Sequence, residues 1–335
     1  MAYRVYETDG GAGTSDIERE ELARADAELT VVPYTTEAEL ARHLADADGL
    51  LVIYTHIGEL ALSHMPHLKV IVRTGIGLDP IDLEAATAHG VCVANVPDYC
   101  VPEVSDHALA LILACGRKLL PLDRAVHRGT WDAVSTARPL VRLEGQVVGI
   151  VGLGRIGQRL ARLAKGVGFV VLAHDPYYSP TQIAAVGAEP VSLEDLLARS
   201  DYVSINCPLT AQTRHLIGTE QLRRMKPTAH LVNTSRGAVV DEQALIEALR
   251  EERIAGAALD VLEKEPPTAD SPLLALPNVI LTPHAAFYSE QSYLEVRRRS
   301  AQEVARVLTG HYPRSLANPA VKERLRDLGR VLAVE

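Results

Sequence analysis

Residues 147–157, VVGIVGLGRIG, decide the fold of this 335-residue chain. The apolar run 147–151 predicts a buried strand, and the apolar residues spaced three or four apart behind Gly157 predict a helix. A second apolar run, 169–172, ends three residues before Asp175. The order of strand, glycine turn, helix, strand and acid is typical of a βαβ unit that binds a dinucleotide.

The glycines of this segment have separate expected tasks. Gly152 makes the tight turn, Gly154 lets the backbone approach a pyrophosphate, and Gly157 lets the helix pack closely on the strand. The start of the helix, at Arg155 and Ile156, offers N–H groups and a partial positive charge to phosphates. An isolated GxGxxG is often an ordinary turn. The flanking elements favour the nucleotide interpretation here.

The acid at the end of the second strand indicates which dinucleotide is bound. Asp175 can accept hydrogen bonds from ribose hydroxyls, and it would repel a 2′-phosphate. The next residues, Pro176, Tyr177 and Tyr178, include no arginine to receive such a phosphate. The sequence therefore predicts NAD rather than NADP as the cofactor. The alternative is a surface aspartate at a strand end.

Composition excludes several classes of protein. The net charge of −9 argues against a nucleic-acid partner, and the apolar fraction of 47% is ordinary for a globular protein. The four cysteines are scattered, so we expect buried thiols and no metal site. The N-terminus lacks the pattern of a signal peptide, and no apolar run is long enough to span a bilayer. These features predict a cytoplasmic protein.

Short strands and helices alternate along the chain, which predicts an α/β fold with parallel sheets. In the first part we expect strands at 3–7, 29–32, 50–54, 70–72 and 91–94, and helices at 16–25, 36–44 and 81–89. In the second part we expect helices at 102–120, 193–198, 219–225, 242–251 and 290–308, and strands at 202–206, 230–233, 256–261 and 279–281. Thr36, with Glu39 three residues on, predicts a capped start of the second helix.

Residues 122–145 have no clear periodicity, and they contain the only tryptophan, Trp131. We expect an extended arm here. A tryptophan on an exposed arm is easily explained if another subunit covers it, so the sequence predicts a dimer. The alternative is that Trp131 packs on its own domain.

Three predicted strands are followed by loops that carry Arg236, Glu265 and His284. Because the carboxyl ends of parallel strands border the ligand crevice, these side chains can converge. Arginine can bind a carboxylate and polarise a keto oxygen. Histidine can exchange a proton near neutral pH, and a glutamate can orient the imidazole. The set suits hydride transfer to a 2-keto acid.

Each of these residues also has an ordinary interpretation when it is considered alone. Arg236 could be a surface ion-pair partner, Glu265 a solvated loop charge and His284 a core histidine. Their joint placement behind three strands, beyond a nucleotide motif, favours the catalytic interpretation.

The chain resembles the D-isomer-specific 2-hydroxyacid dehydrogenase family. The motifs that carry this resemblance follow the family's order and span nearly the whole chain: VRTGIGLDPID, VGLGRIGQ, LVNTSRGAVVDEQAL, GAALDVLEKEP and LTPHAAFYSEQ. Within the family, NVPDYCVPEVSDHAL and HAAFYSEQ look most like the C-terminal binding protein branch. The resemblance implies a discontinuous flavodoxin-like substrate domain at 1–103 and 286–335. It also implies a Rossmann NAD-binding domain at 104–285, through which a homodimer forms.

The family's roles transfer to matching positions. The resemblance implies that Arg236 binds substrate, that Glu265 supports His284 and that His284 is the acid/base. It assigns substrate binding to Arg73, Gly75, Ile76, Gly77 and Phe287. It assigns cofactor binding to Val104, Gly152, Gly154, Arg155, Ile156, Gly157, Asp175, Cys207, Pro208, Thr213, Thr234, Ser235, Arg236, Asp260, His284 and Ala286.

The resemblance implies an NAD-dependent enzyme that interconverts a 2-keto acid and its (R)-2-hydroxy acid. Two alternatives stay open: an NAD(H)-sensing binding module with residual activity, and a phosphoglycerate-type dehydrogenase. Phe287 stands where the C-terminal binding protein branch has tryptophan. A phenyl wall there would favour apolar substrate side chains, unless Phe287 packs into a domain interface instead.

Overall fold

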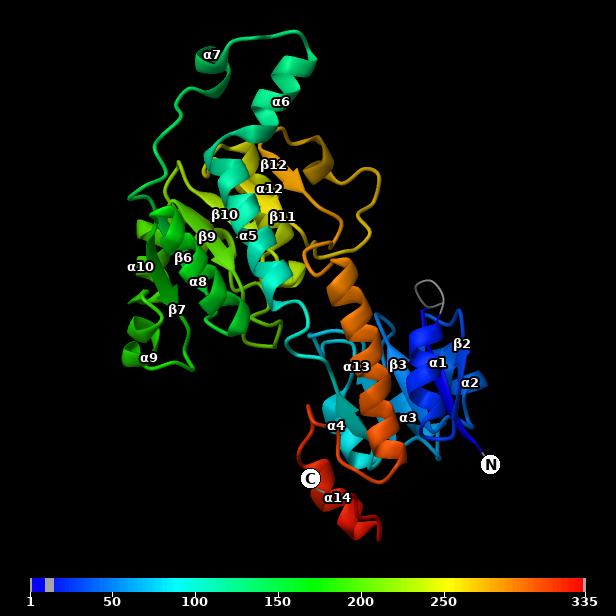
Figure 1. The fold of residues 1–335 in the computed structure, drawn as a ribbon. Coiled ribbons are helices and arrows are strands. Elements are labelled where there is room, and N and C mark those ends of the chain that lie inside the picture. The colour runs from blue at the N-terminus through cyan, green and yellow to red at the C-terminus, as the bar shows by residue number, and fades with distance from the viewer. Residues whose placement is uncertain (1, 10–14, 334–335) are drawn as a thin grey trace. The chain divides into compact units, whose positions relative to one another are not determined.

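The computed structural model describes residues 2–9 and 15–333, and Met1, residues 10–14 and residues 334–335 lie outside this description. The chain divides into two compact units (Figure 1). Unit 1 consists of Met1–Tyr99 and Ser289–Glu335, and unit 2 consists of Cys100–Tyr288. The boundaries predicted from the sequence fall at 103/104 and 285/286. Each unit is described by itself below.

Unit 1 is an α/β unit whose strands all come from the first hundred residues. Its elements in chain order are β1 (Tyr3–Glu7), α1 (Asp16–Ala23), β2 (Ala27–Val31), α2 (Glu37–His43), β3 (Gly49–Val52), α3 (Glu59–Ser63), β4 (Val70–Arg73), α4 (Leu83–Ala88), β5 (Cys92–Ala94), α13 (Glu290–Leu308) and α14 (Val321–Asp327). The strands pair in parallel in the order β2-β1-β3-β4-β5. This is the flavodoxin-like order of a doubly wound sheet.

Both faces of this sheet are covered, because successive strand residues point to opposite sides. Leu50 of β3 packs with Leu40 of α2 and Leu62 of α3 on one face. Leu51, the next residue, packs with Leu22 of α1 and Val304 of α13 on the other. Figure 1 shows α13 and α1 running side by side. The segment that returns from the end of the chain therefore completes the core of unit 1.

Unit 2 carries the larger sheet. Its elements in chain order are α5 (Val101–Gly116), α6 (Leu119–His127), α7 (Ala133–Ala137), β6 (Val147–Val151), α8 (Arg155–Val167), β7 (Val170–His174), α9 (Pro180–Ala185), β8 (Glu189–Pro190), α10 (Leu193–Arg199), β9 (Tyr202–Ile205), α11 (Thr219–Arg224), β10 (His230–Asn233), η1 (Gly237–Val239), α12 (Glu242–Arg250), β11 (Gly256–Leu259), η2 (Pro272–Ala275) and β12 (Val279–Leu281).

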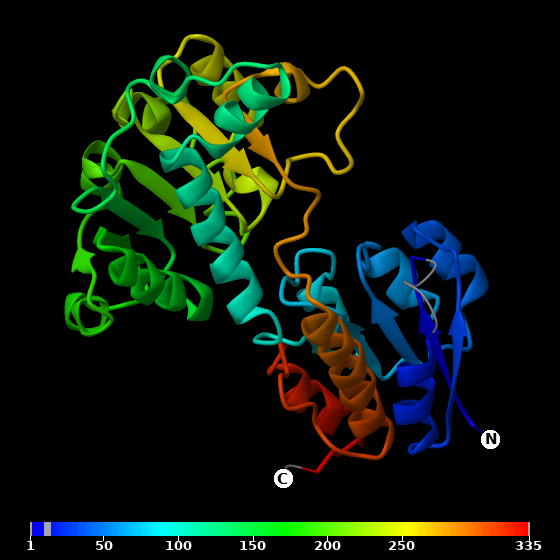
Figure 2. The same ribbon diagram turned by 45° about the horizontal axis from the view of Figure 1, so that its top comes forward.

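The strands of unit 2 form a seven-stranded parallel sheet in the order β12-β11-β10-β9-β6-β7-β8. The chain winds outward from β6 in both directions, as in the Rossmann fold, with one strand added at the far edge. Helices α5 and α8 cover one face, and α10, α11 and α12 cover the other. Figures 1 and 2 show α5 lying along the sheet. The predicted fold of two doubly wound parallel-sheet domains is confirmed.

The prediction for residues 102–145 is wrong in part. One helix over 102–120 is expected, but the structure has α5 and α6 separated at Lys118, whose φ is +51°. That left-handed residue ends the helical path. The expected irregular arm also contains α7, whose first N–H groups are capped by the Asp132 carboxylate. Trp131 lies between these helices and is 90% exposed.

Among the described residues, no helix is both long enough and apolar enough to cross a membrane.

Candidate active site

The glycine loop between β6 and α8 has one open position and two closed ones. A Cβ on Gly152, whose φ is +93°, would lie 2.6 Å from the Cys207 nitrogen. A Cβ on Gly157 would lie 2.2 Å from the Gly152 oxygen. A Cβ on Gly154 would have no described protein atom within 4 Å. Gly152 and Gly157 therefore permit close packing, and Gly154 leaves room for a ligand beside the backbone.

The start of α8 is suited to an anion. Its N-cap is Gly154, which provides no side-chain cap for the first N–H groups, Arg155 and Ile156 form the first turn, and that turn has no acidic residue. Asp175, behind β7, accepts hydrogen bonds from the Leu153 nitrogen at 2.7 Å and the Tyr177 nitrogen at 2.9 Å. These bonds fix the carboxylate and leave lone pairs for ribose hydroxyls.

Two buried polar atoms near the ends of β9 and β10 have no hydrogen-bond partner within the described chain: Asn206 Oδ1 and Thr234 Oγ1. Because buried polar atoms in folded proteins are nearly always paired, a bound polar ligand is a natural partner for them. The Ser235 hydroxyl donates to the Cys207 carbonyl and joins the two strand ends. These residues fit a dinucleotide. Sequence reasoning missed Asn206, although it is the last residue of a predicted strand and directly follows β9.

His284 and Glu265 form a hydrogen-bonded pair. His284 Nδ1 lies 2.7 Å from Glu265 Oε2, and Glu265 Oε1 accepts from the Leu262 nitrogen at 2.9 Å. A carboxylate is only an acceptor, so Nδ1 carries the proton. The other ring nitrogen, Nε2, is then free of this bond and can accept or donate a proton according to the state of the ring. This is the arrangement that an acid/base histidine needs.

Burial raises the pKa of the Glu265 carboxyl, but its hydrogen bonds from His284 and Leu262 and the positive charges of His284 and Arg236 outweigh that effect. The pKa of Glu265 is therefore lowered, and the group is a carboxylate at neutral pH.

Arg236 follows β10, and a glycine brings its loop against the loop of Glu265. A Cβ on Gly237 would lie 1.9 Å from the Leu262 carbonyl carbon, so only glycine allows this approach. Asn233 holds the turn: its Nδ2 donates to the Arg236 oxygen at 2.9 Å, and its Oδ1 accepts from the Ser235 nitrogen at 3.0 Å. The positive charge of Arg236 contributes to lowering the pKa of the Glu265 carboxyl. The structure thus brings the three predicted catalytic residues together.

The loop that carries His284 is built around Asp260, which is 2% exposed. Asp260 Oδ1 accepts from Thr282 Oγ1 at 2.6 Å and from the Ala285 nitrogen at 2.8 Å, and Oδ2 accepts from the Ala286 nitrogen at 3.0 Å. The predicted role of Asp260 is to hold a nicotinamide carboxamide. In the structure its carboxylate organises the 282–286 loop. Thr282, which belongs to a quoted motif, was missed as a member of this site.

Phe287 lies beside the imidazole. The ring centroids of His284 and Phe287 are 6.4 Å apart, with an interplanar angle of 75°. An apolar aromatic surface therefore lies next to the acid/base pair.

The remaining predicted residues of unit 2 lie in helix α5 or in the loop that follows β9. Val104 is buried in α5. Thr213 Oγ1 donates to the Pro208 oxygen at 2.6 Å and accepts from the Thr210 nitrogen at 2.8 Å, which closes the loop after β9. Burial raises the pKa of the Cys207 thiol to about 11, so it stays protonated at neutral pH.

Unit 1 contains the predicted substrate turn, which follows β4. Arg73 is buried, and its Nη1 donates to the Thr74 oxygen at 3.1 Å. Gly75 has a φ of +153°, and a Cβ there would lie 1.2 Å from Arg73 Nη1. The guanidinium group occupies the space that a side chain would fill. Asn95 Nδ2 supports the turn by donating to the Ile76 oxygen at 2.6 Å, and Gly77 follows.

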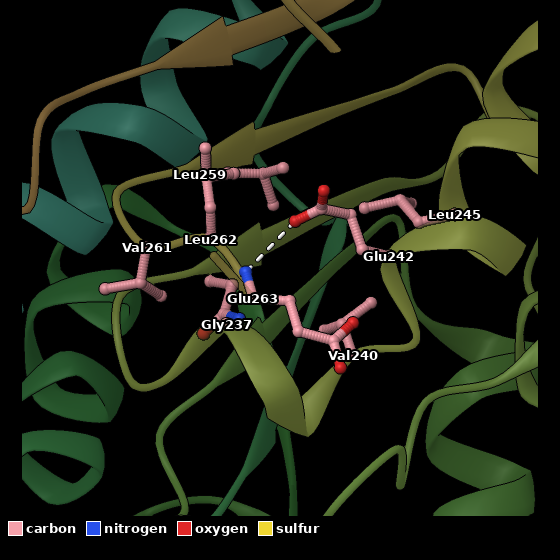
Figure 3. Close-up of a pocket in the computed structure, with 9 residues that line it drawn as sticks. Gly237, Val240, Glu242, Leu245, Leu259, Val261, Leu262 and Glu263 are labelled. Atoms are coloured by element: carbon pink, nitrogen blue, oxygen red, sulfur yellow. Dashed lines mark hydrogen bonds between the residues drawn. The ribbon is translucent and has the colours of Figure 1, made fainter. Parts of the chain in front are cut away.

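A separate pocket of unit 2 is lined in part by residues of the loops that carry Arg236 and Glu265 (Figure 3). It is lined by Gly237, Leu262 and Glu263 among others, and the Glu263 nitrogen donates to Glu242 Oε2 at 3.0 Å. Its lining includes none of Arg236, Glu265 and His284, so it is not the reaction site. Within the described ranges, no group of three or more His, Cys, Asp or Glu side chains could hold a metal ion.

The fold and this site define a class of protein, an α/β oxidoreductase with a dinucleotide-binding sheet. Comparison with known proteins makes the class specific. The family profile described as D-isomer specific 2-hydroxyacid dehydrogenase, NAD binding domain, matches residues 109–286. The chain belongs to the D-isomer-specific 2-hydroxyacid dehydrogenase family.

Named relatives share much of the sequence. A glyoxylate reductase of Korarchaeum cryptofilum is 41% identical over 84% of this chain and 86% of its own length. A D-3-phosphoglycerate dehydrogenase of Methanocaldococcus jannaschii is 39% identical over 87% of this chain, and the chain spans 55% of that longer protein. A glyoxylate reductase structure from Paecilomyes thermophila has a TM-score of 0.85 at 27% identity, covering 95% of this chain and 99% of that one.

A solved D-lactate dehydrogenase from Aquifex aeolicus, complexed with NAD and lactic acid, has a TM-score of 0.81 at 30% identity and covers 91% of this chain and 96% of that one. The chain is an NAD-dependent D-2-hydroxyacid oxidoreductase, as the sequence predicts.

Proposed function

We propose that Arg236, Glu265 and His284 carry the reaction, with His284 as the acid/base. The observation that carries this proposal is the 2.7 Å bond between His284 Nδ1 and Glu265 Oε2, which leaves Nε2 for the substrate. The two carboxylate oxygens of Glu265 are both engaged, so the imidazole is held in one orientation.

NADH, when bound, would supply a hydride for the keto carbon in the direction of keto-acid reduction. In that direction His284 is protonated, and its Nε2–H donates the proton that the keto oxygen needs as the carbonyl becomes a hydroxyl. In the reverse direction neutral His284 accepts the hydroxyl proton at Nε2. The ionised Glu265 stabilises the charged ring in both directions. Arg236 binds the substrate carboxylate and polarises the keto oxygen through its planar set of donors.

We assign the further substrate contacts as the sequence predicts them. Arg73 contributes a second cation, and the N–H groups of Gly75, Ile76 and Gly77 contribute hydrogen-bond donors for a carboxylate. Phe287 contributes the apolar wall. For the cofactor, we assign the pyrophosphate to the 154–157 backbone and the adenine ribose to Asp175. Thr234 and Asn206, whose buried oxygens need partners, complete that side.

The test measures NADH oxidation with glyoxylate, pyruvate, longer aliphatic 2-keto acids and 3-phosphohydroxypyruvate. We expect His284→Ala to lower kcat by about 100-fold or more, since general acid catalysis contributes roughly 10² to 10⁴. NADH affinity, measured by fluorescence titration, should stay close to that of the wild type. Equal turnover by the wild type and the variant on every active substrate would refute the role of His284.

A phosphorylated substrate is a second candidate, because a relative of 39% identity is named D-3-phosphoglycerate dehydrogenase. Phe287, next to the imidazole, favours an apolar side chain over a phosphate. We therefore expect kcat/KM to rise with aliphatic chain length, by up to about 0.8 kcal/mol per buried CH₂. Phe287→Ala should flatten this profile. A preference for 3-phosphohydroxypyruvate would select the second candidate.

We also propose that the protein is a cytoplasmic homodimer that associates through the arm of unit 2. Apolar side chains gather there: Trp131 is 90% exposed, Val134 71% and Val141 59%. Such surface is usually covered by a partner. A Trp131→Ser variant should shift the mass measured by light scattering toward the monomer, and an unchanged mass would remove this argument. Membership of the C-terminal binding protein branch remains a prediction.

A further inference from the structure

His107 is a titratable side chain of unit 2 that the proposed reaction does not use. It lies in α5, and its Nε2 is 3.1 Å from Thr282 Oγ1. The same nitrogen is 3.6 Å from Asp260 Oδ1, and the side chain is 26% exposed. His107 and Thr282 are 175 residues apart in the sequence. The helix that begins unit 2 is thereby tied to the loop that carries His284.

The direction of these hydrogen bonds follows from what each group can donate. Asp260 accepts from the nitrogens of Ala285 and Ala286, which is the behaviour of an ionised carboxylate. The Thr282 hydroxyl has one proton, and it donates that proton to Asp260 Oδ1 at 2.6 Å. Toward His107 the hydroxyl oxygen must therefore accept. His107 consequently carries a proton on Nε2, and the chain of donors runs from His107 through Thr282 to Asp260.

This chain ends on the backbone around the acid/base residue. Asp260 holds the nitrogens of the two residues that follow His284, and the Asp260 carbonyl accepts from the His284 nitrogen at 2.8 Å. The position of Asp260 is itself linked to the arginine loop, since its nitrogen donates to the Asn233 oxygen at 2.9 Å. Asp260 thus holds the backbone that carries the imidazole.

We propose that His107 is a positioning residue for the reaction. Its Nε2–H satisfies Thr282 and orients the hydroxyl toward Asp260, and Asp260 in turn fixes the 284–286 backbone and with it the direction of the His284 ring. The inference rests on the proposed role of His284. It predicts that losing the donor at position 107 slows the chemical step without weakening cofactor binding.

The experiment compares His107→Leu with His107→Gln in the full-length enzyme. Leucine fills similar space without a donor, whereas the glutamine amide can reach Thr282 with an N–H. We expect His107→Leu to lower kcat by about 10-fold, since small misplacements of reacting groups are costly, with the Kd for NADH nearly unchanged. His107→Gln should recover most of kcat. Wild-type kcat in His107→Leu, or equal losses in both variants, would overturn the proposal.

A second pair of variants tests the same path and carries the test if His107→Leu does not fold. Thr282→Val removes the relaying hydroxyl at nearly constant shape, and Thr282→Ser keeps it. We expect Thr282→Val to lower kcat about as much as His107→Leu, and Thr282→Ser to stay near the wild type. The double variant of His107→Leu and Thr282→Val should lose no more kcat than Thr282→Val alone, because both substitutions break the same chain of hydrogen bonds. A loss of kcat in the double variant equal to the product of the two single losses would overturn the proposal.

His89→Leu is the matched control, because His89 also pairs with an acid. Its Nε2 lies 3.0 Å from Glu59 Oε1, and its side chain is 31% exposed. It belongs to unit 1 and should leave kcat unchanged. The His284→Ala result separates the two claims. If His284→Ala is active, the proposed function fails; if His284→Ala is inactive and His107→Leu is fully active, only the positioning role fails.

Discussion

Two regions of unit 2 differ in whether their polar atoms find hydrogen-bond partners within the protein. In the cluster around His284, all four carboxylate oxygens of Glu265 and Asp260 accept hydrogen bonds from the chain. In the nucleotide region, buried oxygens of Asn206 and Thr234 lack a partner among the described residues, and space is open beside Gly154. The hydrogen bonds around His284 are thus formed within the protein, whereas the nucleotide region keeps buried polar atoms that a ligand can pair.

The largest effect in this comparison is expected on kcat, when the hydrogen bonds of Glu265 are removed. Glu265→Ala removes the carboxylate that holds Nδ1 of His284, and we expect kcat to fall by about 100-fold. Glu265→Gln keeps an acceptor but loses the charge, so its loss should be smaller, about 10-fold. Steady-state kinetics with a saturating keto acid measures both. Equal losses would show that the charge, not the orientation, is the whole contribution.

A smaller effect is expected from two alanine substitutions in the glycine loop, and they should differ in kind. Gly157→Ala places a Cβ 2.2 Å from the Gly152 oxygen, so it should lower the thermal midpoint even without cofactor. Gly154→Ala meets no described atom within 4 Å, at a φ of −63° that alanine adopts easily. It should leave that midpoint unchanged and raise the Kd for NADH about 10-fold by crowding the phosphates. A lowered thermal midpoint for Gly154→Ala together with a raised Kd for Gly157→Ala would mean that the two glycines have the opposite roles.

The smallest effect concerns the Thr234 hydroxyl, which has no hydrogen-bond partner in the described part of the chain. Thr234→Val keeps the shape and removes a buried polar atom, so it should stabilise the free protein by about 1 kcal/mol in denaturant unfolding. The same change should weaken NADH binding several-fold. Thr282→Val is the control, because the Thr282 hydroxyl is hydrogen-bonded and its loss should destabilise the protein. Destabilisation by both variants would mean that Thr234 is satisfied within the fold.

The sequence predicts those parts of the fold that depend on local pattern. Strands β1, β10 and β12 and helix α13 have the predicted bounds, and Thr36 forms the predicted capping box. The exceptions depend on single backbone angles or short segments. The left-handed Lys118 divides a continuous apolar pattern. The short helices α3 and α9 have too few residues for a periodic signal.

The site, like the fold, has a part that the sequence predicts and a part that it does not predict. Arg236, Glu265 and His284 could be predicted because parallel strands deliver their following loops to one edge. The hydrogen bonds that support these residues could not be predicted, because bonds such as that of His107 to Thr282 join residues far apart in the chain. Nor does sequence pattern show that Asp260 serves the 282–286 loop. Only the tertiary structure shows which donors reach its oxygens.

His284 has a φ of +53°, a left-handed conformation that costs an ordinary L-residue roughly 1 kcal/mol. A glycine at 284 would carry no such cost, so His284→Gly should resist denaturant better than His284→Ala by about 1 kcal/mol, although we expect both variants to be inactive. A campaign of directed evolution that rewards heat resistance alone would therefore drift away from the histidine. Any selection for a more robust catalyst from this scaffold has to reward turnover in the same round.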